Sequence, residues 1–244
     1  ATLTFVPSGR DRKVKTVDEI YFLCGVDLPT LDVASLWRYL GVGFAGSRID
    51  AFDSAAYVAA LNRISTEPMK AQMRLSIARD YLIPKFVHGL TFSVVSVRKL
   101  RSLAHETRRA VRRWLDLPTS CPNAYIHSPT SAGGLGVPDF VQFVPRNRVN
   151  RLVRLENSSF AAVREAFRLH GRTALASARR STEGHRLKPS YAQQLHASVD
   201  GSELKSCSDE SASVAWMRRP DGIPSSDFKT TLGFVSMCCR LASG

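Results

Sequence analysis

The sequence lacks the marks of a membrane or secreted protein. No run of about 18 apolar residues is present, and the first ten residues carry neither a basic leader nor a long apolar stretch, so we expect no membrane span and no secretory signal. Cysteine is scarce: the 5 cysteines are an odd number with irregular spacing, which favours reduced thiols over a disulfide framework. These absences favour a nuclear or cytosolic protein.

Signals for catalysis and metal binding are weak as well. A zinc site needs paired Cys or His at spacings of about two to five residues, whereas these residues are isolated here, apart from the adjacent Cys238 and Cys239. Two-metal phosphoryl transfer needs clustered carboxylates, and the acidic pairs Asp18-Glu19 and Asp209-Glu210 are typical of a solvated surface. No nucleophile-elbow motif marks a serine. The residues themselves therefore predict no catalytic side chain and no metal ligand.

One glycine pattern suggests a cofactor site. Gly41, Gly43 and Gly46 spell the G-x-G-x-x-G fingerprint of dinucleotide-binding proteins directly after a strand-like run. Such a site needs a helix that opens at this turn inside a βαβ unit, but Arg48 and Asp50 precede the first helical spacing and no parallel α/β alternation surrounds them. We therefore interpret these glycines as a turn that leaves a strand.

Positive charge is what the sequence has in excess. Lys and Arg number 34 against 21 Asp and Glu, which gives a net charge of +13 and a pI of about 10.0. Such a balance indicates a polyanionic partner. Nucleic acid is the first candidate and an anionic membrane surface the second, and the missing membrane segment favours nucleic acid.

The spacing of apolar residues predicts an α+β, mainly α fold. Strand-like runs at Ile20–Cys24 and Leu28–Leu31 predict a short N-terminal β-hairpin that turns at Gly25–Asp27, and Leu36–Val42 predicts one further strand. Helical spacing begins after Asp53, so the hairpin is expected to be followed by helices.

Two short helices are predicted first. The N-cap of the earlier one is expected at Ser54. The later one begins at Pro68 and is ended or kinked by Pro84. Its predicted apolar face consists of Met69, Met73, Ile77 and Tyr81.

The third predicted helix is the clearest. Apolar residues recur at spacings of three, four and seven between Val97 and Trp114, basic residues occupy most of the remaining surface, and Pro118 ends the pattern. Because Trp114 falls on the apolar face, we expect it to pack in the core. Phosphate contacts are expected from this helix and the one before it, through Lys70, Arg74, Lys85, Arg98, Lys99, Arg101, Arg108, Arg109, Arg112 and Arg113.

The signal weakens after this helix. Turn residues dominate Pro118–Pro138, and a basic amphipathic segment follows at Phe140–Leu155, in which Pro145 predicts a break. Helical spacing then recurs only at Phe160–Leu169, so the remainder after Glu156 is predicted to be a loosely specified linker.

Several short motifs follow one another in the order found in a known family. They are Pro7-Ser8-Gly9, Trp37-Arg38-Tyr39-Leu40-Gly41-Val42, Pro68-Met69-Lys70-Ala71-Gln72-Met73-Arg74-Leu75, Leu82-Ile83-Pro84-Lys85-Phe86-Val87-His88, Val111-Arg112-Arg113-Trp114-Leu115-Asp116-Leu117-Pro118, Gly133-Gly134-Leu135-Gly136-Val137-Pro138 and Leu195-His196-Ala197-Ser198-Val199-Asp200-Gly201. In this series the sequence resembles the reverse transcriptases of site-specific non-LTR retrotransposons that insert into ribosomal RNA genes. Each motif alone is weak, whereas the ordered series is specific.

The resemblance implies a place for each part of the chain. Residues 1–50 would be the end of the polymerase palm, residues 51–118 the helical thumb, and residues 119–244 a partly loop-rich linker. In such polymerases the thumb holds the template-primer duplex by its backbone. The primer grip would be matched by Trp37, Arg38, Tyr39, Leu40 and Gly41.

The resemblance also implies what lies elsewhere. The family's catalytic Ala-Asp-Asp motif would precede the position matching Ala1, and no Asp-Asp pair occurs here. We therefore expect part of an RNA-directed DNA polymerase that is inactive alone, with Mg²⁺ and an endonuclease belonging to the full polyprotein. The implied partners are template RNA, a DNA primer and a ribosomal DNA target in the nucleus, with no membrane. The alternative is a stand-alone basic helical nucleic-acid-binding module without an enzymatic parent.

Overall fold

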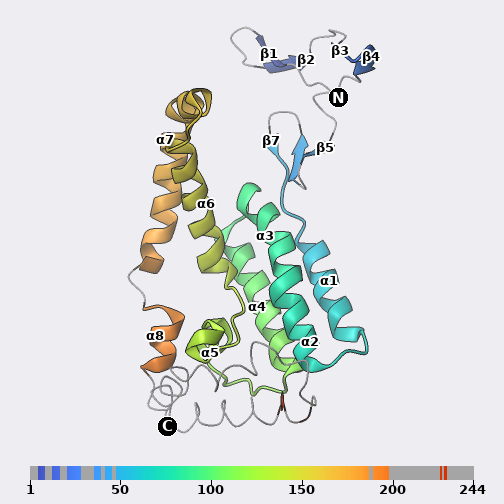
Figure 1. Cartoon of the computed structure of the whole chain (residues 1–244), viewed down its shortest axis with the longest axis vertical. Coiled ribbons are helices and arrows are strands. Elements are labelled where there is room, and N and C mark those ends of the chain that lie inside the picture. The colour runs from blue at the N-terminus through green and yellow to red at the C-terminus, as the bar shows by residue number, and fades with distance from the viewer. Residues whose placement is uncertain are drawn as a thin grey trace. The chain divides into compact units, whose positions relative to one another are not determined.

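The computed structural model describes residues 5–8, 13–16, 21–28, 36–39, 42–45, 48–186, 189–197, 226, 228 and 229. It is mainly helical, with short antiparallel strands in the first part of the chain (Figure 1), which confirms the predicted fold class. The chain divides into two compact units, one of residues 1–52 with 88–95, the other of residues 53–87 with 96–244. The division into palm, thumb and linker at residues 50 and 118 stays a prediction.

The first unit contains small antiparallel sheets. In chain order the strands are β1 (Phe5–Ser8), β2 (Lys13–Thr16), β3 (Tyr21–Leu23), β4 (Val26–Leu28), β5 (Leu36–Tyr39), β6 (Val42–Ala45) and β7 (Arg48–Ile49). Strands β3 and β4 form the predicted hairpin, with Leu23 opposite Val26. The turn lies at Cys24-Gly25, where both residues have positive φ, 54° and 78°, as a two-residue hairpin turn requires. The turn predicted at Gly25–Asp27 is therefore shifted, since Val26 and Asp27 already belong to β4, and of the return strand predicted at Leu28–Leu31 only Leu28 lies within the described residues.

The single strand predicted at Leu36–Val42 is wrong, because this segment belongs to two strands. β5 pairs with β6, and β6 with β7, so the chain forms a three-stranded meander. Gly43 of β6 lies against Asp50: a Cβ at Gly43 would lie 3.0 Å from the Asp50 Cβ, and the Asp50 amide donates to the Gly43 carbonyl at 2.7 Å. This close approach accounts for one glycine of the dinucleotide-like pattern, whereas Gly41 and Gly46 lie outside the described residues.

The second unit is helical. In chain order its elements are α1 (Ser54–Thr66), α2 (Ala71–Ser76), the π-helical turn η1 (Ile77–Leu82), α3 (Ile83–Phe92, whose last residues belong to the first unit), α4 (Val97–Trp114), α5 (Asn123–His127), the 3₁₀ turn η2 (Thr130–Ala132), α6 (Phe140–Glu156), α7 (Ala161–Arg186) and α8 (Tyr191–His196). Asp53, not Ser54, is the N-cap of α1, since its carboxylate accepts hydrogen bonds from the amides of Ala55 and Ala56. Ser96 caps α4 by accepting from the Lys99 amide.

The helix predicted from Pro68 begins later, at Ala71, and it does not end at Pro84, because α3 continues past that residue. The π-helical turn η1 comes directly before α3, and the amide of Ile83, the residue after η1, donates to the carbonyl of Ala78 five residues back. Such a single π-helical turn can occur inside an otherwise α-helical segment, and here it ends shortly before Pro84, which has no N–H to donate. The predicted apolar face is also wrong in part: Met73 and Tyr81 are exposed, and the buried face at the same spacing is Ala71, Leu75, Ala78 and Leu82.

Two further predictions are corrected in the later part of the chain. Pro145 does not break α6, which continues through it from Phe140 to Glu156. As the sixth residue of the helix, it lacks the N–H that would otherwise bond to the carbonyl four residues back. The segment predicted as a loosely specified linker contains the 26-residue helix α7. Helices α6 and α7 pack against one another around Leu152, Phe167 and Leu175, and this packing stabilises a segment whose own pattern is weak. None of the described helices is long and apolar enough to span a bilayer.

Candidate nucleic-acid interface

Helix α4, the predicted phosphate-binding helix, is fixed in place along one face. Two hydrogen bonds join it to α1: the Tyr57 hydroxyl donates to Thr107 Oγ1 at 2.7 Å, and Trp114 Nε1 donates to Ser65 Oγ at 2.9 Å. The prediction that Trp114 packs in the core is confirmed. The buried side chains of α4 are Leu100, Leu103, Ala104, Thr107, Ala110, Val111 and Trp114, and the helix packs on α1, α2 and α6.

The opposite face of α4 carries an exposed, mainly basic row, which we call the α4 stripe: Arg98, Arg101, His105, Arg109 and Arg113. These residues are spaced by three or four positions, so they share one side of the helix. At 1.5 Å per residue the stripe is about 22 Å long. Double-stranded nucleic acid carries one charge per about 1.7 Å of its axis, so a stripe of this length can meet several phosphates. Within it, Arg109 also pairs with Glu106 at 2.5 Å.

Arg108 and Arg112, predicted to bind phosphate, lie on the flank of α4 and contact protein groups. One Arg112 nitrogen donates to the Cys121 carbonyl and to Asn123 Oδ1, both at 2.9 Å. Arg108 approaches the Nε2 atom of His127 at 3.5 Å. Burial, and to a lesser degree the charge of Arg108, lower the pKa of Arg112. Both arginines therefore position the segment that contains α5, and both are only partly exposed.

The remaining predicted cations are not gathered on the α4 stripe. Lys70 and Arg74 come from α2, which packs on α4, and Lys85 comes from α3. Lys70 and Lys85 are exposed, whereas Arg74 is half-buried and donates to the carbonyl of Glu67 at 2.9 Å. Lys99 is exposed on α4 itself. The structure thus brings Arg98, Arg101, Arg109 and Arg113 together and leaves the others at separate places.

The residues predicted to match a primer grip lie in the first unit. Trp37 of β5 stacks on Phe44 of β6, with ring centroids 4.7 Å apart, and Arg38 is exposed in the same strand opposite Gly43. Tyr39 ends the strand, while Leu40 and Gly41 lie outside the described residues. The stack explains why two large aromatic residues are tolerated on so small a sheet.

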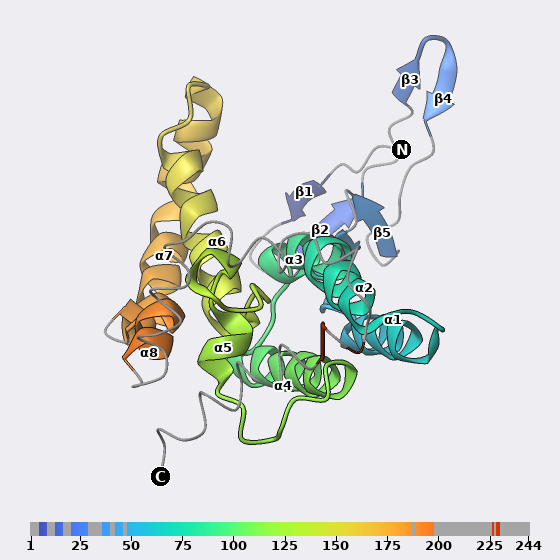
Figure 2. The same ribbon diagram turned by 60° about the horizontal axis from the view of Figure 1, so that its bottom comes forward.

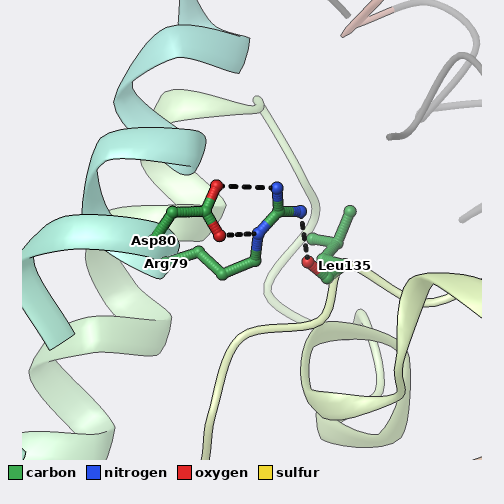
Figure 3. Close-up of polar contacts among 3 residues, drawn as sticks. All are labelled: Arg79, Asp80 and Leu135. Atoms are coloured by element: carbon green, nitrogen blue, oxygen red, sulfur yellow. Dashed lines mark hydrogen bonds and ion pairs between the residues drawn. The ribbon is translucent and has the colours of Figure 1, made fainter. Parts of the chain in front are cut away.

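An arginine that sequence reasoning did not single out joins η1 to the glycine-rich turn at residues 133–136. Arg79 donates from Nε and Nη2 to the two carboxylate oxygens of Asp80, at 2.8 and 3.0 Å, and from Nη1 to the Leu135 carbonyl at 3.4 Å (Figure 3). The turn itself needs glycine, because a Cβ at Gly134 would lie 2.4 Å from the carbonyl oxygen of Ser128. This group therefore links η1 to the turn at residues 133–136.

A second polar group attaches α8 to the body of the second unit. The Tyr191 hydroxyl donates to Asp139 at 2.6 Å, and the rings of Tyr191 and His127 lie 5.0 Å apart. Burial is the main cause that lowers the pKa of His127, with Arg108 and Arg112 acting in the same direction and Asp139 and the Val137 carbonyl opposing them. No three potential metal ligands gather anywhere in the part of the chain that the structure describes.

The pair of helices α6 and α7 is also rich in arginine, and its helical pattern is predicted from the sequence only in part. Its signal is the helical spacing of Val163, Phe167 and Leu175, combined with arginines on the intervening positions. Polar residues and a glycine at position 171 hide this pattern. The exposed arginines of this pair lie on α6 and α7, apart from the stripe on α4.

Comparison with known proteins gives a consistent family. No family model matches the chain. It is 32% identical over 220 residues to a Pol polyprotein from the type-1 retrotransposable element R2 of Nasonia vitripennis, a match that covers 89% of the chain and 21% of that protein. The corresponding R2 polyprotein of Bradysia coprophila is 31% identical over 231 residues, 88% of the chain and 26% of that protein.

A third relative agrees. The Pol polyprotein of the type-2 element R2DM of Drosophila melanogaster is 29% identical over 208 residues, 82% of the chain and 20% of that protein. The chain therefore spans about a fifth to a quarter of the length of these relatives. By this homology over most of its length, the chain belongs to the Pol polyproteins of R2-type non-LTR retrotransposons, as the predicted resemblance indicated.

Proposed function

We propose that this chain is the nucleic-acid-holding part of an RNA-directed DNA polymerase, and that the α4 stripe grips the template-primer duplex through its phosphates. The single observation that supports this proposal most is the geometry of α4. Seven buried side chains fix one face of the helix, so four arginines are presented on the other without rearrangement. Preorganised donors lose little entropy on binding, and arginine can contact phosphate in a bidentate manner.

A polymerase must hold any sequence, so its grip should fall on phosphate and sugar and not on base edges. A helix face that presents arginine and no Asn or Gln side chain fits this requirement. We propose template RNA and a DNA primer as the partners, and a ribosomal DNA target through the whole polyprotein in the nucleus. Polymerase chemistry needs Mg²⁺ held by carboxylates. We assign no Mg²⁺ ligand to the described residues, and we place the catalytic carboxylates and the endonuclease outside this chain.

Salt-titrated binding of the full 244-residue chain to an RNA/DNA hybrid duplex tests the grip. The variant replaces Arg98, Arg101 and Arg113 by Gln together. Each lost phosphate contact lowers the slope of log affinity against log salt by about 0.9, so the slope should fall by roughly 3 if all three contacts exist. The loss should be the same for duplexes of unrelated sequence.

The matched control replaces Arg108 and Arg112 by Gln. Because these two side chains contact His127, Cys121 and Asn123, the control should lower thermal stability and change the salt slope less than the stripe variant does. An unchanged slope in the stripe variant, with its fold intact by circular dichroism, would refute the grip.

A further inference from the structure

The helical hairpin of α6 and α7 has more positive charge than its packing requires. The two helices lie side by side in both views, with the turn between them at the end away from α5 and α8 (Figures 1 and 2). Their sequences contain ten arginines, no lysine and three glutamates. Like charges at this density destabilise a compact structure unless a counter-charge binds. The hairpin therefore has a surface suited to a polyanion.

Two of the exposed arginines have polar partners within the hairpin itself. Arg164 donates to the carbonyls of Ser158 and Ser159 at 2.6 and 2.9 Å, which closes the turn after α6. Arg168 pairs with Glu165 at 3.3 Å. These two arginines therefore have structural partners.

The other exposed arginines have no ion pair with any described residue. On α7 they are Arg172, Arg179 and Arg180, and on α6 they are Arg146 and Arg154. Arg172 and Arg179 are seven residues, or about two turns, apart, so they share one side of α7 about 10 Å from each other. Antiparallel packing places the arginines of both helices along the hairpin.

Two further arginines of α6 are partly withdrawn from solvent. Arg148 and Arg151 are half-buried, and burial first, then the charge of Arg151, lowers the pKa of Arg148. Burial also lowers the pKa of Arg151. Both also interact with other groups of the protein, so they are not counted among the arginines available to a ligand.

The chemistry of the exposed arginines on α6 and α7 indicates which anion they would bind. Guanidinium matches phosphate in a bidentate geometry, whereas a lipid surface is attracted equally well by lysine, which the hairpin lacks. We propose that the α6–α7 hairpin is a second nucleic-acid-binding surface, which holds the phosphate backbone of a duplex separately from the α4 stripe. This inference rests on the proposed function only in that both ligands are nucleic acid.

Two surfaces on one chain give it two duplex-binding sites, which short ligands can occupy one by one. We would titrate the full chain with an RNA/DNA duplex of one helical turn, about 34 Å long, and measure stoichiometry and salt slope. Wild type should bind two duplexes. R172Q/R179Q should weaken the second site and lower the salt slope of that site by about 2.

The matched control is R164Q/R168Q, which removes the same charge from the same helix. Because those side chains are engaged with the turn carbonyls and Glu165, this variant should retain the second site and lose thermal stability. A stripe variant carrying R98Q/R101Q/R113Q should lose the other site alone, so failure of the stripe to bind and failure of the hairpin to bind are separate results.

Three outcomes would overturn the inference. The first is that R172Q/R179Q keeps the stoichiometry and salt slope of wild type. The second is that both double variants reduce binding equally, which would show only the effect of net charge. The third is that R172Q/R179Q reduces binding to vesicles of anionic phospholipid while duplex binding is unchanged. That result would assign the hairpin to a membrane surface.

Discussion

Helices α4 and α7 are both long and rich in arginine, but they are supported in different ways. α4 buries seven of its 18 residues against α1, α2 and α6. Among the described side chains of α7, Phe167 and Leu175 are buried, and they pack on Leu152 of α6. Local stability follows the number of buried apolar contacts, so α4 should open only with the whole unit, whereas α7 should open alone. Two helices with similar surface charge thus differ in their expected local stability, which is high for α4 and low for α7.

The largest expected effect comes from truncating the largest buried side chain of each helix, Trp114 in α4 and Phe167 in α7. Trp114 and Phe167 are 2% and 6% exposed. Replacing either by Ala should cost about 3–5 kcal/mol at its own site. For W114A this cost should fall on the whole second unit and lower its unfolding midpoint in urea. For F167A this cost should appear as lost hydrogen-exchange protection in α7 and in the half of α6 nearer the turn between the two helices.

Hydrogen exchange of α4 distinguishes the two cases. F167A should leave the amides of α4 as protected as in wild type, whereas W114A should lower protection in both helices. If F167A reduced protection in α4 as much as W114A does, the two helices would belong to one cooperative unit and the contrast between them would be wrong.

The same contrast explains how much of the fold the sequence could predict. α4 was predicted almost to its boundaries, because its buried residues recur regularly from Leu100 to Trp114. α7 was predicted only over its first turns, because its apolar positions are few and Gly171 interrupts them. A helix stabilised mainly by a partner helix has little signal in its own residues.

The candidate site, like the fold, could be predicted from the sequence only in part. Composition and spacing predicted a basic face on α4 correctly, but they could not separate Arg98 and Arg113, which face away from the core, from Arg108 and Arg112, which contact α5. All four have similar neighbours in sequence. The distinction depends on residues such as Cys121 and His127, which only the folded chain brings alongside the helix.

A smaller effect is expected from the glycine inside α7. A Cβ at Gly171 would lie 2.1 Å from Cδ2 of Phe167, so the ring of Phe167 lies directly over the helix backbone there. G171A should therefore destabilise the hairpin by about 1–3 kcal/mol through overpacking, even though alanine favours helix formation. Exchange protection of α7 measures this loss.

An exposed position in the same helix provides the control. A174G should cost about 1 kcal/mol through helix propensity alone, because Ala174 is exposed. If G171A stabilised α7 while A174G destabilised it, the ring of Phe167 would be able to move aside for the added methyl group. The packing of the hairpin would then not depend on the position of that ring.

The smallest expected effect is a pH dependence at His127 of α5, which lies between Arg108 of α4 and Tyr191 of α8. His127 Nδ1 donates to the Val137 carbonyl at 2.8 Å, which leaves Nε2 unprotonated toward Arg108 at 3.5 Å. Burial and the cationic Arg108 and Arg112 outweigh Asp139 and lower the pKa of His127 in the folded chain.

A lowered folded pKa fixes the direction of this effect. Its contribution to stability is complete above the unfolded pKa of about 6.5 and is lost as the pH falls from there through the folded pKa. Wild type should therefore lose more thermal stability than H127Q between about pH 7.5 and pH 5.5, with protection lost first in α8, which Tyr191 holds beside His127. H105Q, on the exposed stripe, should follow wild type. Equal losses in wild type and H127Q would mean that α8 is held by Tyr191 and Asp139 without help from the neutral imidazole.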